Sequence, residues 1–207
     1  QNVVRYCYRP FDVRWLYWEP ETKLLDRNRA DYFPHVFVGN VWLCATQQNR
    51  KEFDPPIVTN NLGSLHLIER GANLFPLYLN QHSVLGTEIK PNLSKRAVDY
   101  LAQHDLTAPD HLFYHAIAMM HAPAYRVENA GALRQDWPRI PLPATKHLLE
   151  ESANLGQQIA ALLDTALKDP TKFVQISLDK SQAGGVHERV ILAKYAAEMT
   201  GNSVAVG

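Results

Sequence analysis

Apolar and polar residues alternate in short runs through the first 80 residues, which is the pattern of β-strands. Residues 3–8 are rich in β-branched and aromatic side chains and predict a strand. Residues 12–18 predict a second strand, with Val13, Trp15 and Tyr17 on one face. A third short strand is expected at residues 57–59.

Two hairpins are expected in the same half of the chain. Gly39-Asn40 joins apolar runs at 35–38 and 41–46, and this dipeptide suits a tight turn that needs a positive φ. A polar stretch at residues 69–73 separates two further runs, 65–68 and 75–79. The first 80 residues are therefore predicted to be short strands and turns.

After residue 80 the apolar spacing becomes helical, following a connector at residues 81–91. Asn92 is expected to cap a helix that runs from residue 94 to 103. Residues 146–167 predict a long amphipathic helix in which Gly156 is a tolerated weak point. The sequence thus predicts a mixed α+β fold, with a β-rich N-terminal half and a helical C-terminal half.

Between these helices, prolines divide the stretch from Phe113 to Pro143 into separate segments. A helix starting at Asp110 should end at Ala122-Pro123, because proline lacks the N–H and disfavours helical geometry before it. Helix can resume over residues 125–133. Residues 136–143, which hold three prolines, should form an extended segment held in place between two parts of the fold.

Composition narrows the class of protein without defining a function. Among the 207 residues, 46% are hydrophobic and 20% charged, and the formal net charge is zero, which argues against a strong non-specific nucleic-acid binder. Cys7 and Cys44 lie in apolar surroundings and predict two buried free thiols in a reducing compartment. We find no membrane-spanning segment and no signal peptide in the sequence. Because the chain begins with Gln1, we expect it to be part of a longer polypeptide.

Catalytic motifs are missing from the sequence. It has no phosphate-binding G-x-x-x-x-G-K-[ST] loop, no Asn-Pro-Pro-Tyr run of an adenine methyltransferase and no nuclease signature of paired carboxylates with lysine. A metal site is only weakly indicated by the histidines His111, His115 and His121, because no cysteine is near them. We therefore predict no catalytic residues and no metal ligands in this chain.

Several ordered motifs carry a family resemblance. They are Tyr8-Arg9-Pro10-Phe11-Asp12, His35-Val36-Phe37-Val38, Phe75-Pro76-Leu77-Tyr78-Leu79, His121-Ala122-Pro123-Ala124-Tyr125-Arg126 and the segment 136–143. Together they resemble the C-terminal specificity region of type ISP restriction–modification enzymes and related adenine-N6 methyltransferases. The resemblance covers residues 4–165 and does not reach the last forty.

The resemblance implies a DNA target recognition domain whose partners are double-stranded DNA and a methyltransferase domain of the same polypeptide, in a bacterial or archaeal cytoplasm. It implies no cofactor in this chain. S-adenosylmethionine, ATP and Mg²⁺ would belong to other domains of the parent protein, which would methylate and cleave the DNA in defence against phage. The predicted subdomains are 1–80 for DNA recognition and 81–170 for helical bracing, followed by a tail, 171–207, without an assignment.

Reading duplex DNA requires arginine or lysine for guanine and asparagine or glutamine for adenine, on loops that rigid strands hold in place. Three polar stretches in the β-rich half fit this need. The predicted base contacts are Gln48, Arg50, Asn60, Asn61 and Ser64. The predicted phosphate contacts are Arg29, Lys51, Lys95 and Arg96.

Other prominent residues have a structural interpretation. We expect Arg126, Arg134 and Arg139 to form ion pairs or to cap carbonyl groups. The aromatic residues of the first two strands could stack on bases, but their alternation favours core packing; they are Tyr6, Tyr8, Phe11, Trp15, Tyr17 and Trp18.

Three alternatives remain at this point. The chain could be the recognition domain of a stand-alone or phage-defence methyltransferase, which would lack helicase motifs. It could be a protein-interaction scaffold, in which case neutralising Arg50 and Lys51 would leave its function intact. Metal analysis would test the third, a metal-dependent enzyme built on the histidines.

Overall fold

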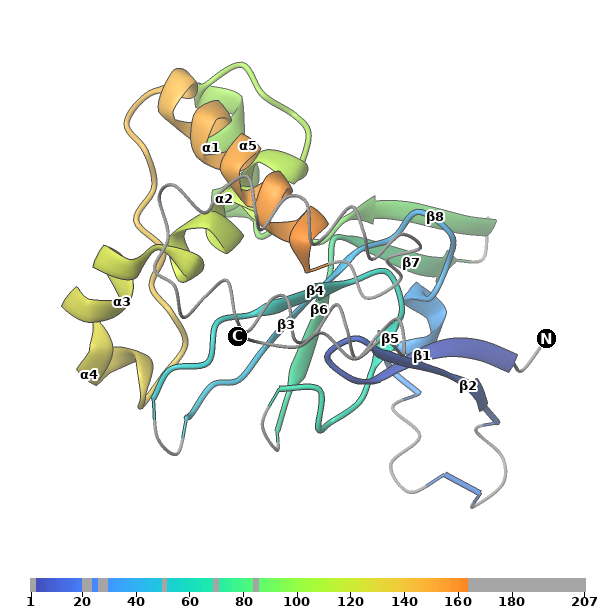
Figure 1. Ribbon diagram of the computed structural model, residues 1–207. Coiled ribbons are helices and arrows are strands. Elements are labelled where there is room, and N and C mark those ends of the chain that lie inside the picture. The colour runs from blue at the N-terminus through green and yellow to red at the C-terminus, as the bar shows by residue number, and fades with distance from the viewer. Residues whose placement is uncertain are drawn as a thin grey trace. The chain divides into compact units, whose positions relative to one another are not determined.

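Strands fill the first half of the chain and helices the second, which confirms the predicted α+β fold (Figure 1). The computed structural model describes residues 3–19, 24–25, 30–49, 52–68, 71–83 and 86–163, all within one unit that comprises residues 1–166. The strands are β1 (Val3–Arg9), β2 (Asp12–Tyr17), β3 (Trp42–Ala45), β4 (Ile57–Thr59), β5 (Leu62–Gly63), β6 (Asn73–Pro76), β7 (Tyr78–Ser83) and β8 (Gly86–Pro91). The helices are a 3₁₀ turn (Phe33–His35), α1 (Lys95–Gln103), α2 (Asp110–His121), α3 (Pro123–Glu128), α4 (Ala130–Leu133) and α5 (Lys146–Leu162).

The described strands form two three-stranded sheets and a two-stranded ribbon. One sheet has the order β2-β1-β5, the other has the order β4-β3-β6, and β7 pairs with β8. Strands β1 and β2 form an antiparallel hairpin through Pro10 and Phe11, and Phe11 takes a φ of 63° at the turn. In the central sheet β3 runs antiparallel to both neighbours, with Trp42 opposite Thr59 and Pro76.

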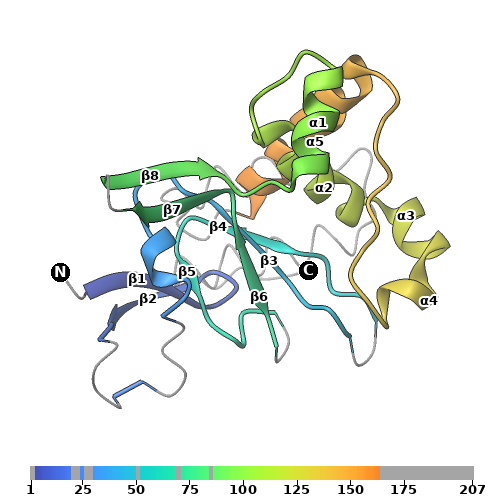
Figure 2. The same ribbon diagram turned by 180° about the vertical axis from the view of Figure 1, so that it is seen from behind.

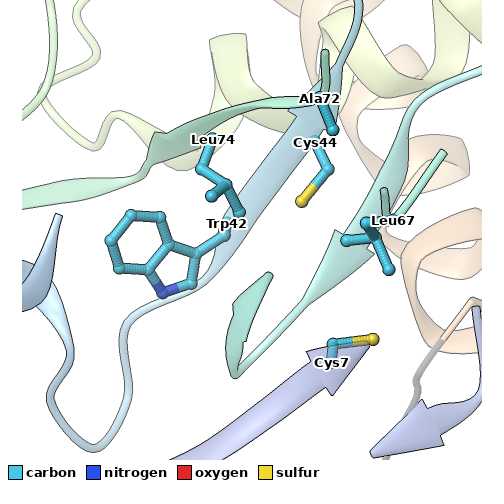
Figure 3. Packing of buried hydrophobic residues seen from close by; sticks show 6 residues of the cluster. All are labelled: Cys7, Trp42, Cys44, Leu67, Ala72 and Leu74. Carbon is cyan, nitrogen blue, oxygen red and sulfur yellow. The ribbon is translucent and has the colours of Figure 1, made fainter. Parts of the chain in front are cut away.

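The core of the β-rich half lies between these two sheets. Figure 3 shows Cys7 of β1, Trp42 and Cys44 of β3, and Leu74 of β6 packed with Leu67 and Ala72. Both cysteines are free and buried, as predicted.

Two expected hairpins are wrong. Residues 36–38 are not a strand, and β3 pairs with β4 and β6 instead. Gly39 does adopt a positive φ of 93°, but Asn40 is only 1% exposed and binds other backbone. Its amide donates to the carbonyls of His35 (2.8 Å) and Tyr78 (2.9 Å), and its Oδ1 accepts from the N–H groups of Val41 (3.1 Å) and Tyr78 (3.0 Å). The turn at Val38 and Gly39 does form, and the Asn40 N–H donates to the Phe37 carbonyl at 3.2 Å, but the turn does not join two paired strands.

The second expected hairpin, over residues 65–79, is absent because residues 65–68 form a turn, while β7 continues past residue 80. The expected connector at 81–91 is the rest of β7 and all of β8. Gln81, Thr87, Glu88 and Ile89 are exposed, so this ribbon lacks the apolar alternation that marks half-buried strands. The division into reading and bracing subdomains stays a prediction.

Helix α1, the first helix of the C-terminal half, begins at Lys95, directly after its N-cap serine. The Ser94 hydroxyl accepts from the Ala97 N–H at 3.3 Å, so Ser94 and not Asn92 is the N-cap of α1. Asn92 instead donates its side-chain amide to the Pro76 carbonyl at 2.9 Å. Helix α2 ends at His121, before Pro123, as predicted. No described helix is both long enough and apolar enough to cross a bilayer.

The close contact of α2 and α5 depends on Gly156, which is buried. A Cβ at this position would run into the backbone carbonyl of Tyr114 on α2. Gly156 is therefore a point of close helix approach, and its interpretation as a tolerated weak point was wrong.

The segment 136–143 contains no helix, as its prolines predict, and it is attached to three helices. Its carbonyls at Arg139, Pro141 and Pro143 accept hydrogen bonds from one helix each. The donors are the Tyr125 hydroxyl of α3 (3.0 Å), the His115 ring of α2 (2.9 Å) and the Tyr100 hydroxyl of α1 (2.7 Å). Since prolines have no N–H, side-chain donors to the carbonyls are the main polar contacts open to such a segment.

Protein groups contact both ring nitrogens of the buried His115 and one ring nitrogen of the half-buried His121. His115 Nε2 lies 2.9 Å from the Pro141 carbonyl, which only accepts, so Nε2 carries a proton, and Nδ1 lies 2.7 Å from the Ser152 hydroxyl oxygen. His121 Nε2 similarly donates to the Pro56 carbonyl at 2.9 Å. In the part of the chain that the structure describes, no three His, Cys, Asp or Glu side chains converge as a metal site would require.

We expect the protein to lose stability as the pH falls from about 7.5 to about 5.5. Burial lowers the pKa of His115 and of His121 below the ordinary value, so the fold keeps both rings neutral. The unfolded chain takes up protons near pH ~6.5, so it binds more protons than the native state below that pH. Urea unfolding at three pH values measures the trend, and His115→Gln should flatten it. A midpoint that stays constant or rises on acidification would contradict the expectation.

Candidate nucleic-acid interface

The two predicted groups of base-reading residues lie at opposite ends of the strands of the central sheet. Gln48 follows β3, whereas Asn60 and Asn61 follow β4. These strands are antiparallel, with Cys44 opposite Ile57, so their C-terminal ends point in opposite directions. The structure therefore separates the two groups.

The segment that leaves β3, named the recognition loop here (residues 46–54, of which the structure describes 46–49 and 52–54), combines exposed side chains with a backbone that is held at Asn49. Gln47 and Gln48 are exposed, while Asn49 is only 6% exposed. The Asn49 N–H donates to the Arg134 carbonyl at 3.2 Å, and its amide donates to the Leu133 carbonyl at 3.1 Å. Figures 1 and 2 both show this loop beside α4.

Asn49 also organises the loop from within. Its Oδ1 accepts from the Thr46 hydroxyl at 2.9 Å and from the Asp54 N–H at 3.3 Å. One buried amide thus closes the loop on itself and ties it to the turn after α4. A loop backbone held in this way needs little ordering when the loop meets a ligand.

A second contact ties the recognition loop to the segment 136–143. The Gln47 amide donates to Asp136 Oδ1 at 3.0 Å, and that oxygen also accepts from the Trp137 N–H at 2.8 Å. These two hydrogen bonds, the one from Gln47 first, lower the pKa of Asp136 and keep it ionised. The Trp137 ring in turn packs edge-on against Phe75 of β6, with centroids 5.3 Å apart.

The other predicted contacts have different environments. Asn60 is exposed at a hollow of about 210 Å³ between β4 and helices α2 and α5, and Asn61 is half-buried. Ser64 is 1% exposed, and its hydroxyl accepts from the His66 N–H at 2.8 Å, so it holds a turn and could reach DNA only if that turn opened. Arg29, Arg50 and Lys51 lie outside the described residues.

The predicted phosphate contacts Lys95 and Arg96 are exposed at the first turn of α1. Lys95 forms an exposed ion pair with Asp99 at 3.2 Å, which solvent screens and a phosphate could replace.

None of the six aromatic residues in and around the β1–β2 hairpin that were expected to pack in the core is buried. Trp15 is 67% exposed and Tyr17 is 52% exposed. The Arg5 guanidinium lies over the Trp15 ring, 5.1 Å from its centroid. Figures 1 and 2 show this hairpin on the opposite side of the unit from α3 and α4.

Sequence reasoning missed Asn49 and Asp136 as organisers of the site. Asn49 contacts a residue 84 positions away, and Gln47 contacts one 89 positions away. No local pattern reports such pairs. The one available signal was the proline-rich segment 136–143, which the sequence predicts to be fixed in place between two parts of the fold.

We expect Asn49→Ala to lower the free energy of unfolding by roughly 2 kcal/mol, because it leaves the buried Leu133 carbonyl and the Thr46 hydroxyl without their partner. Chemical denaturation measures the change. Gln48→Ala is the matched control, since the exposed neighbour should change stability by less than about 0.5 kcal/mol. Equal effects of the two variants would show that Asn49 does not anchor the loop.

Comparison with known proteins agrees with this architecture. The model of the Type ISP C-terminal specificity domain matches residues 1–200. The chain therefore belongs to this Type ISP family of specificity domains. The match reaches beyond the motifs at residues 4–165, into the part of the sequence where no resemblance was seen.

Solved structures share the fold. A cryo-EM structure of a DrdV–DNA complex matches with 27% identity and a TM-score of 0.61, over 79% of this chain and 16% of that one. A nuclease-deletion mutant of the Type ISP restriction–modification enzyme LlaGI with a DNA substrate mimic matches with 23% identity and a TM-score of 0.57, over 78% and 14%. The ATP-dependent Type ISP enzyme LlaBIII bound to DNA matches with 16% identity and a TM-score of 0.59, over 78% and 11%.

This chain therefore spans about a sixth or less of the length of those solved chains. No curated protein matches it.

Proposed function

We propose that this chain reads the sequence of duplex DNA as the target recognition domain of a restriction–modification enzyme in a bacterial or archaeal cytoplasm. The observation that carries the proposal is the recognition loop, whose glutamine side chains are exposed while Asn49 fixes its backbone. Glutamine amides can bind adenine through two hydrogen bonds in the major groove, and a fixed loop keeps them in register. The DNA-bound structures with this fold support the same function.

The recognition loop would make the principal base contacts, through Gln48 and, from the same loop, Arg50, with Lys51 on a phosphate. Asn60 and Asn61 lie at the opposite end of the strands from Gln48, so they would contact a separate part of the duplex. Lys95 and Arg96 are exposed and would contact phosphates, Lys95 by exchanging its ion pair with Asp99, and Arg29 is proposed for the same role from the sequence alone. Phosphate contacts of this kind position the domain without reading sequence.

We propose that catalysis belongs to other domains of a longer polypeptide. The chain carries no catalytic motif, and the solved proteins it matches are several times longer. In this proposal a methyltransferase domain uses S-adenosylmethionine, and a motor and nuclease use ATP and Mg²⁺. The helical half would brace the recognition half against the methyltransferase domain.

We expect Gln48→Ala to relax base preference at one position of the bound sequence, at a cost of about 1–3 kcal/mol for the preferred base. The physical reason is the loss of an amide that hydrogen-bonds a base edge. Binding of the purified variant to a panel of duplexes, each with one base pair changed, measures the effect. Gln158→Ala, which removes an exposed glutamine from α5, is the matched control. An unchanged base preference in both variants would remove Gln48 from the interface.

A further inference from the structure

The turn that follows α4 (residues 134–136) forms one surface with the recognition loop. The carbonyl of Arg134 accepts from the Asn49 N–H at 3.2 Å, and Asp136 accepts from the Gln47 amide at 3.0 Å. The side chains of Arg134, Gln135 and Asp136 are all exposed. Two segments about 85 residues apart in the chain thus present their polar side chains side by side.

Arg134 combines a fixed backbone with an available guanidinium. Asn49 holds its carbonyl, yet its side chain has no hydrogen-bond or ion-pair partner among the described residues. The structural role expected for Arg134 from the sequence, an ion pair or a carbonyl cap, is therefore not formed within that part of the chain. A guanidinium in this position retains all five N–H donors for a ligand.

The charges around Arg134 do not select a phosphate as that ligand. The loop and turn carry the carboxylates of Glu52, Asp54 and Asp136 together with the cations of Arg50, Lys51 and Arg134, so they have no excess positive charge that would attract a phosphate group. A base edge is neutral and offers both donors and acceptors. Arginine binds the O6 and N7 atoms of guanine through two hydrogen bonds, and this is the commonest specific contact in the major groove.

We propose that Arg134 is a further specificity-determining residue, which reads a guanine beside the base read by Gln48. This inference rests on the proposed function, because it assigns a second reader to the same interface. It extends the reading surface from the β-rich half into the helical half, across the boundary that the sequence predicts at residue 80.

Selection from a random duplex pool followed by sequencing tests the inference, with the wild-type chain, Arg134→Ala, Arg134→Lys and Arg139→Ala compared. Arg139→Ala is the matched control, since it removes an equal charge from an exposed side chain five residues away. We expect the wild type to select a motif that contains guanine, and Arg134→Ala to lose preference for that one guanine by about 5- to 150-fold. Arg134→Lys should restore only part of it, because lysine lacks the planar fork.

Other outcomes separate the two claims. A wild-type motif that persists unchanged in Arg134→Ala overturns this inference and leaves the proposed function standing. Uniformly weaker binding with a smaller salt dependence would make Arg134 a phosphate contact, which also overturns the inference. A wild type that selects no motif contradicts the proposed function and this inference with it. Equal thermal unfolding of the variants confirms that they fold alike.

Discussion

Gly156→Ala should lower the free energy of unfolding by roughly 3 kcal/mol, although alanine is the better helix former. The added Cβ would meet the Tyr114 carbonyl, which is backbone and cannot rotate away, so α2 and α5 would have to separate. This contact is a large part of the helical layer, since Leu149 and Ala153 of α5 are buried on the same face. Chemical denaturation of the variant measures the loss.

Gly131→Ala is the control for this prediction. Gly131 lies in α4, and a Cβ there would have no atom within 4 Å. Alanine should therefore stabilise the protein by up to ~1 kcal/mol through helix propensity alone. Opposite signs at the two glycines would establish that close helix packing sets the cost at Gly156. Stabilisation at both would contradict the packing seen here.

Asn40→Ala should be at least as damaging, with an expected loss of roughly 3–5 kcal/mol. Asn40 is 1% exposed, and all four of its side-chain hydrogen-bonding directions bind backbone. Alanine would remove the partner of four part-buried backbone groups, which are the N–H and carbonyl of Tyr78, the N–H of Val41 and the carbonyl of His35. Urea unfolding followed by circular dichroism measures the change.

Asn73→Ala provides the matched control for Asn40. The Asn73 amide makes one exposed hydrogen bond, to the Gly71 carbonyl at 3.0 Å. Its loss should cost less than about 1 kcal/mol. Asn40→Asp adds a second check, because it keeps the shape and the acceptor but removes both donors. If Asn40→Asp were as stable as the wild type, the two bonds donated to carbonyls would not matter.

The sequence predicted best where the signal is local. The period of apolar residues located α2 and α5, Pro123 ended α2, and the β-branched run at residues 57–59 became β4. That the segment 136–143 contains no helix followed from its prolines. Each of these conclusions rests on neighbours within a few residues.

Prediction failed where distant residues decide the structure. Gly39-Asn40 has the local composition of a hairpin turn, yet Tyr78, 38 residues away, binds the Asn40 side chain and buries it. The spacing around Gly156 shows only a poor helix former, because the carbonyl of Tyr114 that requires glycine belongs to another helix. The β7–β8 ribbon was missed because its exposed residues include Gln81, Thr87 and Glu88, so its strands show no apolar alternation.

In the candidate site, too, local features were predicted and features set by distant residues were not. Gln48 was found from its side-chain chemistry and its place after a strand. Asn60 and Asn61 were grouped with Gln48 in the prediction. The sequence did not reveal that β3 and β4 are antiparallel, which places these residues at the opposite end of the strands. Asn49 and Arg134 became visible only once the recognition loop and the turn after α4 were seen together.

The most direct test of DNA reading is a selection from a random duplex pool with the wild-type chain at ~50 mM salt, where phosphate contacts are strong. We predict a retained pool with a discrete sequence motif, and binding that weakens steeply as the salt rises to ~200 mM. A retained pool as random as the input, or no retention at ~50 mM salt, would contradict the account.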